Sequence, residues 1–321
     1  MEIFLITLQA VVTLLGIGVL GFWIIGHHRA SGDTLGFLSA LSIDVAVPCL
    51  VLASLIIDFS PQKNPDWWHM PLWWLSFLAV SLLLSLLCSR IARREFRGEF
   101  AMGLFFQNGL FFPLIIVTGL FGTQNPYFVS LFLLVFLHPT LMFSTYQFFF
   151  PRKGHAQVFS MAHFFNPVLV STIVGMAIAL IGMQQYVPQF IKTIFIMVGA
   201  MASPLFMLIL GGNLYHDMML DVGGKRQFYY AEVIKFSLAK NFVFPLVVLG
   251  ILILIKPAFP VALILMLEAA VPPVTAIPIF AERSGGNRAL ASQFIIGSFL
   301  LSLISIPIVL YFFSLYFPFP G

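Results

Sequence analysis

Charged side chains are scarce in this sequence. Of its 321 residues, 9% are Asp, Glu, Lys or Arg and 60% are hydrophobic, whereas soluble domains carry about 25% charged residues. This composition excludes a soluble globular protein. The net charge of +4 comes from Lys and Arg in the loops and gives no indication of nucleic-acid binding.

Recognisable catalytic and metal-binding patterns are also missing. The two cysteines, Cys49 and Cys88, both lie in apolar runs, which excludes a disulfide framework and a cysteine metal site. No hydrolase, kinase, phosphate-loop or metal motif is present, so we expect no enzyme, no metal and no other cofactor. The histidines, His138 among them, show no ligand geometry and are interpreted as interfacial or loop residues.

The hydrophobic residues form continuous runs of about twenty, the length of a helix that crosses roughly 30 Å of hydrocarbon. The sequence therefore predicts an all-α membrane protein with about ten transmembrane helices. The predicted spans are 3–26, 34–57, 72–90, 100–121, 127–149, 167–183, 190–213, 229–255, 259–281 and 289–316.

Basic residues in the loops predict the orientation. Loops after odd-numbered spans hold eleven Lys and Arg residues, and loops after even-numbered spans hold three. The positive-inside rule then places the odd loops in the cytoplasm and both termini on the non-cytoplasmic side of the membrane. The run 90–97, with four arginines, is interpreted as an anchor against anionic membrane lipid.

Two of the spans contain residues that should break a helix. The stretch Leu267–Ala281 holds Pro272 and Pro273, and Phe106–Thr118 holds Pro113. Proline lacks an amide hydrogen and clashes with the carbonyl four residues back. Broken backbone at membrane depth is tolerated only where protein or a water-filled cavity satisfies the freed polar groups. We expect these two stretches to be the paired broken helices of a transporter.

Proline spacing also suggests a duplication. Pro204 lies 156 positions after Pro48, and Pro273 lies 160 positions after Pro113. These offsets predict two five-span repeats, residues 1–150 and 151–321. Because five is odd, the second repeat must be inverted in the membrane, as in many secondary transporters. Chance placement of prolines is the alternative.

Three ionisable residues fall deep inside spans: Asp44, Lys240 and Glu268. A charge facing lipid at a helix centre costs about 2.5–3.5 kcal/mol. These side chains should therefore face the helix bundle, pair with one another or be neutral. We predict an ion-coupling role for all three, and a structural ion pair between Lys240 and either carboxylate is the alternative.

The polar residues beside the breaks predict a substrate site. Half-helices beginning at Pro113 and Pro273 would direct free amide hydrogens and positive dipole ends at the membrane midplane, which favours an anion. The predicted substrate-binding residues are Gln107, Asn108, Pro113, Asn166, Pro272 and Pro273. Asn166 precedes Pro167 at the start of span six, where it caps the helix or faces the cavity.

At these residues the sequence resembles the auxin efflux carrier family. The stretch 267–286, with its Pro-Pro, Ala-Glu-Arg and paired glycines, looks like the ninth-helix signature of that family. Asn108 with Pro113, Pro48, Asn166-Pro167 and the stretch 240–245 are also similar. In this chain, however, Asn108 and Pro113 are closer together than is usual, and Glu268 stands where small apolar residues are common.

The resemblance implies a scaffold domain and a transport domain, each drawn from both inverted repeats, with helices four and nine crossing at their prolines. This is the fold shared with bile-acid symporters and sodium–proton antiporters. It implies an elevator-type carrier of a small organic anion, a carboxylate or an auxin-like compound, with a proton or sodium as coupling ion and homodimers among its relatives. The alternatives are a sodium-coupled carrier of an amphipathic substrate and a membrane sensor that binds a ligand without transporting it.

Overall fold

The computed structural model describes residues 2–28, 32–62, 65–122, 125–135, 137–150, 167–220 and 228–319. Within these ranges the chain is almost entirely helical and contains no β-strand longer than a single bridge. Six helical stretches in the described ranges are long and apolar enough to cross a membrane. They are Thr7–His27, Thr34–Ile57, Trp67–Ile91, Gln189–Asn213, Tyr230–Ile255 and Arg288–Tyr316, and they agree with six of the predicted spans.

These long stretches are built as follows: α1 (Glu2–His28); α2 (Gly32–Ala40), η1 (Leu41–Ala46) and α3 (Val47–Ile57); η2 (Trp67–His69), α4 (Met70–Cys88) and η3 (Ser89–Ile91); α10 (Gln189–Gly199) and α11 (Ala202–Leu220); α12 (Tyr230–Leu238), η9 (Ala239–Val243) and α13 (Phe244–Ile255); and α16 (Arg288–Tyr316).

The other predicted spans consist of shorter helices. These are η4 (Arg94–Phe96), α5 (Arg97–Phe105) and α6 (Phe111–Phe121); α7 (Tyr127–Val135), α8 (His138–Thr145) and η5 (Tyr146–Phe149); α9 (Pro167–Leu180), followed by η7 (Met183–Tyr186); and α14 (Phe259–Ala270) and α15 (Ile277–Arg283). At about 1.5 Å per residue, α5 and α6 together with the break between them are long enough to cross the hydrocarbon once.

Two of the long stretches contain a π-helical turn. The turn η1 immediately precedes α3, which has Pro48 in its first turn, and η9 immediately precedes α13, which has Pro245 in its first turn. Proline has no amide hydrogen to donate, and its ring clashes with the carbonyl four residues back. The helix therefore widens into a π-helical turn just before each proline. Asp44 lies in the first of these turns and Lys240 in the second.

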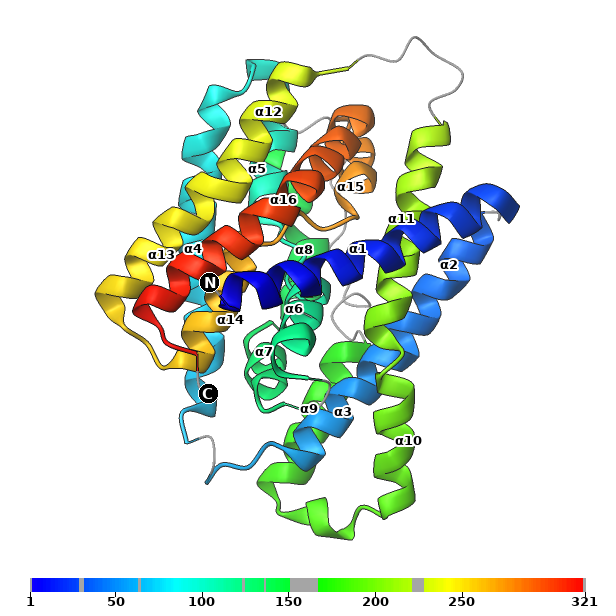
Figure 1. The fold of residues 1–321 in the computed structure, drawn as a ribbon, viewed down its shortest axis with the longest axis vertical. Helices are drawn as coiled ribbons and strands as arrows, with labels where there is room; N and C mark the ends of the chain where they lie inside the picture. Colours follow the sequence, from blue (N-terminus) through cyan, green and yellow to red (C-terminus); the bar gives the residue numbers. More distant parts are fainter. Residues whose placement is uncertain are drawn as a thin grey trace.

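The helices pack into two groups. In the first group, α1 packs on α11, and α3 packs on α9 and α10; in the second, α4 packs on α5, α12 on α16, and α13 on α14. Figure 1 shows α3 and α10 on one side of the molecule and α4, α12 and α13 on the other. Contacts of α1 with α6 and α16, and of α3 with α7, join the groups. Each group contains helices from both halves of the chain.

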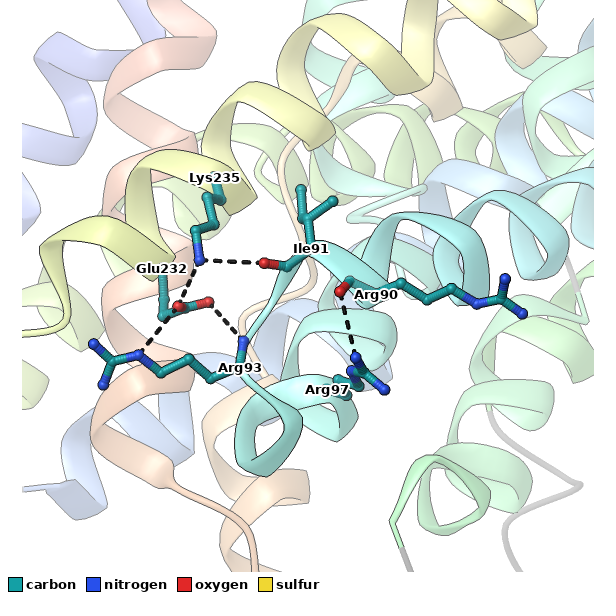
Figure 2. Close-up of polar contacts among 6 residues, drawn as sticks. All are labelled: Arg90, Ile91, Arg93, Arg97, Glu232 and Lys235. Carbon is teal, nitrogen blue, oxygen red and sulfur yellow. Dashed lines mark hydrogen bonds and ion pairs between the residues drawn. The ribbon is translucent and has the colours of Figure 1, made fainter.

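A cluster of charged residues ties α12 to the turns between α4 and α5 (Figure 2). The Glu232 carboxylate, which is almost fully buried, accepts a hydrogen bond from Lys235 Nζ at 2.8 Å and one from the Arg93 backbone amide at 3.4 Å. Lys235 Nζ also donates to the carbonyl oxygen of Ile91 at 3.2 Å. These bonds hold the beginning of α12 against the turns between α4 and α5, and Lys240 follows about two helical turns later.

Candidate functional site at the helix crossover

The first break separates α5 from α6 at residues 106–110. Phe106 has an extended backbone, and the pair Asn108-Gly109 that follows shortly after consists of poor helix formers. Pro113 lies in the first turn of α6, where its missing amide hydrogen costs nothing. The expected half-helix is therefore present, but it begins at Phe111, two residues before Pro113, because a first helical turn accepts proline at more than one position.

The second break separates α14 from α15 at residues 271–276. Val271 is extended because the residue before a proline is biased away from the helical region. The prediction that a half-helix begins at Pro273 is wrong: Pro272 and Pro273 lie in the unwound segment, and α15 begins at Ile277 with Pro278 in its first turn. By its place in a half-helix, Pro278 is thus the counterpart of Pro113.

The two unwound segments pair with each other. The Asn108 amide donates to the carbonyl oxygen of Pro272 at 2.9 Å, and the Val274 amide donates to the carbonyl oxygen of Phe106 at 3.0 Å. Gln107 and Pro273 form an antiparallel bridge between these bonds. The pairing satisfies backbone groups that both breaks expose in the protein interior. The predicted crossing of the broken helices is therefore present in the backbone.

Extended pairing sends neighbouring side chains to opposite faces. Asn108 lines a small pocket of about 80 Å3 at the boundary between the two helix groups. Thr275 of the second break, Ser39 of α2 and Asn213 of α11 supply its other polar side chains. None of these three was predicted as a site residue from the sequence, because their types and spacing carry no signal of a site.

Gln107 lies on the other face of the crossover. Its side-chain amide donates to Ser81 Oγ on α4 at 3.5 Å, and Gln107 is fully buried. His138 of α8 is also buried, and its Nε2 lies 3.1 Å from the Gln107 carbonyl oxygen. Since a carbonyl oxygen only accepts, Nε2 is the protonated nitrogen. The interpretation of His138 as an interfacial or loop residue is therefore wrong, because this residue supports the crossover.

Glu268 lies directly beside the crossover, in the last turn of α14. It is fully buried, and neither carboxylate oxygen has a hydrogen-bond partner among the described residues. Its carboxylate packs against the backbone of Gly109, so closely that a methyl group at Gly109 would overlap it. This contact places Glu268 next to the beginning of α6.

Lys240 approaches the same place from η9. It is fully buried, its Nζ donates to the Ala269 carbonyl oxygen at 3.3 Å, and the ammonium lies 4.7 Å from the centroid of the Phe244 ring. The bond to Ala269 places Lys240 beside the residue that follows Glu268, at the end of α14. A cation at the end of α14 also suits the negative end of that helix dipole.

The remaining predicted site residues take different positions. Asp44 lies on η1 and is exposed on the surface of the chain, so it does not face the bundle interior as expected. Pro113 and Pro272 are buried and contribute through the backbone. Asn166 lies outside the described residues.

A larger cavity of about 560 Å3 lies between the helix groups, with Thr13, Ser54, Thr118 and Ser203 among its polar lining residues. The rings of Phe111 on α6 and Phe206 on α11 stack, with centroids 3.4 Å apart and planes 26° apart. Both rings line the small pocket. One helical turn from each ring, Ile115 and Ser203 line the large cavity. The stack therefore lies between the two spaces.

Apolar helices of spanning length, with a polar crossover buried between them, define a multi-pass integral membrane protein of the transporter class. The family model described as membrane transport protein matches residues 6–310, and the chain belongs to this family, the auxin efflux carrier family. Members of the family are transporters rather than enzymes. A search of curated proteins gave no match.

Proposed function

We propose that the protein is a secondary transporter that moves a small organic anion across a bacterial inner membrane. The observation that carries this proposal is the paired break of two helices, beside which a small pocket with four polar lining side chains lies at the boundary between two helix groups. Discontinuous helices at the membrane midplane are the usual position of substrate sites in secondary transporters. Family membership supports transport in general.

The pocket chemistry favours a carboxylate. Asn108 and Thr275 offer hydrogen-bond donors, and the beginning of α6 adds free amide hydrogens and a positive dipole end. The small pocket holds only a carboxylate-sized group, whereas the cavity of about 560 Å3 is large enough for the body of an organic acid. We expect the acid group at the crossover and the remainder of the substrate in the cavity.

The two packing groups suggest how access to the site alternates between the two sides of the membrane. In our proposal, α1–α3 with α9–α11 form the scaffold, and α4–α8 with α12–α16 form the transport domain, so that residues 1–150 and 151–321 contribute inverted repeats to both. The Phe111–Phe206 stack joins the domains and must separate whenever the transport domain moves as an elevator. Contacts between α1 and α16 would slide in the same motion.

Counterflow in proteoliposomes tests the proposal. Labelled mono- and dicarboxylates should exchange across the membrane, and Asn108→Ala and Thr275→Ala should each weaken apparent affinity about tenfold, as expected for a lost hydrogen bond to a charged group. Thr193→Ala is the matched control, because this exposed threonine of α10 bonds only within its own helix. Binding without flux would instead indicate a sensor, and uptake of an amphipathic compound that requires sodium would indicate the alternative carrier.

The stack provides a second test of the mechanism. Phe111→Ala and Phe206→Ala should remove a barrier between the two spaces and raise the exchange rate, or uncouple it from a driving gradient. Phe190→Ala is the control, since this phenylalanine of α10 is exposed on the outside of the chain. Equal exchange rates in all three variants would contradict a gate at this position.

A further inference from the structure

The Glu268 carboxylate lies in an environment that does not normally hold an ionised group without hydrogen-bond donors. It is fully buried, and no donor among the described residues bonds to either oxygen. Burying a charge without hydrogen bonds is costly, so the carboxylate requires a proton or a compensating cation. Gly109 leaves room for the carboxylate beside the beginning of α6. The carboxylate thus stands where a substrate anion would interact with that helix end.

Lys240 is the compensating charge. Its Nζ bonds to the carbonyl oxygen of Ala269, the residue after Glu268, at the same end of α14. No direct salt bridge joins them within the described chain. The pair is therefore neutral with Glu268 ionised and carries one positive charge when Glu268 is protonated.

The elements packed on α14 carry few other charged or titratable groups, among them Lys256 at the end of α13, Tyr311 and Tyr316 in the second half of α16, and Cys88 at the end of α4. Among the elements packed on α14, Tyr127 of α7 meets the far end of the helix at Phe259. Arg288 at the beginning of α16 pairs with Glu282 of the preceding helix, α15, and both side chains are exposed. His138 contacts the crossover on its other face, through the Gln107 carbonyl. Among the described helices that neighbour α14, Lys240 is thus the charged side chain that lies beside Glu268.

We propose that Glu268 and Lys240 form a proton-dependent anion site, an inference that rests on the transport function proposed above. With Glu268 ionised, the pair is neutral and the carboxylate competes for the positive end of α6. A proton that binds Glu268 converts the carboxylate to a neutral acid, and the Lys240 charge and the α6 terminus then attract one substrate carboxylate. One proton and one negative charge enter and leave the site together.

The coupling ion in this scheme is a proton and not sodium. A metal ion at Glu268 would meet the positive charge of Lys240, and no group of three His, Cys, Asp or Glu residues in the described chain is placed to hold one. Proton transfer needs only the carboxyl group. Because each transported negative charge is matched by one proton, a gradient of one pH unit should drive up to about tenfold accumulation of a monocarboxylate.

The experiment measures monocarboxylate uptake into proteoliposomes at several pH values, with and without a pH gradient and with sodium replaced by choline. In the wild type, the apparent affinity for the monocarboxylate should fall about tenfold for each unit by which the pH rises, once the pH is high enough that Glu268 is ionised in the free protein. Glu268→Gln should remove both this dependence and the accumulation. Glu282→Gln, an exposed carboxyl of α15, should behave as the wild type.

A second pair of variants separates the role of Lys240 from folding. Lys240→Met leaves Glu268 uncompensated and should lower stability, and the double variant with Glu268→Gln should recover the folded protein without recovering anion affinity. Glu268→Gln with wild-type pH dependence, uptake that needs sodium, or normal affinity in the double variant would overturn the inference and leave the transport function standing. If no carboxylate is transported by the wild type, both proposals are wrong.

Discussion

Gly109→Ala tests the contact between the crossover and Glu268. An alanine Cβ would lie 2.8 Å from both Cδ and Oε1 of Glu268 and still closer to Oε2. Gly109 does not have a positive φ, so its backbone accepts alanine without strain. The substitution therefore acts through the overlap, and the carboxylate must rotate or move away from the beginning of α6.

The magnitude follows from two opposing terms. Overpacking a filled interior costs about 1–3 kcal/mol, and replacing glycine with alanine returns about 0.4–1 kcal/mol through the unfolded state. At about 2–4 °C per kcal/mol, apparent melting in detergent should fall by several degrees. Gly250→Ala is the control, because a Cβ at that helix position of α13 meets no atom within 4 Å. This control should melt at the same temperature or higher.

A double-mutant cycle assigns the effect to Glu268. In a Glu268→Ala background the overlapping carboxylate is absent, so Gly109→Ala should be neutral or slightly stabilising, and the two changes should be non-additive by about 1–3 kcal/mol. If the cost of Gly109→Ala persists in that background, the packing of Glu268 against Gly109 is not the cause. Additive effects would refute the reasoning.

Two predictions concern the buried carboxylates of α5 and α12, Glu99 and Glu232. Burial raises the pKa of Glu99 although the Asn287 amide donates to it at 2.6 Å. The folded state then binds the proton more tightly, so melting temperature should fall as pH rises above the ordinary value of 4.5, and Glu99→Gln should flatten that profile. Glu232→Gln should cost about 1–3 kcal/mol because Glu232 is buried with its partners. Lys235→Met should cost less than about 1 kcal/mol, since Lys235 is partly exposed; equal melting losses would contradict this difference.

Local chemistry explains why much of the architecture could be predicted. The number of consecutive apolar residues determines whether a helix can cross the hydrocarbon, and proline is tolerated in a first helical turn but disturbs a helix interior. Both effects act within a few residues, so the spans and the two breaks at Pro113 and Pro272-Pro273 were predicted from the sequence. The beginning of α15 was misplaced because three prolines follow one another closely, and their order alone does not show which one opens the half-helix.

By itself, the sequence determined that this protein spans a membrane, that two of its helices are broken and that Glu268 and Lys240 lie inside spans. Only the tertiary structure decided which side chains share a site. The bridge between Gln107 and Pro273 joins distant parts of the chain, and it sends the Asn108 side chain to the pocket and the Gln107 side chain toward Ser81. The direction in which a side chain points from an unwound segment depends on the segment that pairs with it, and the amino-acid composition does not identify that partner.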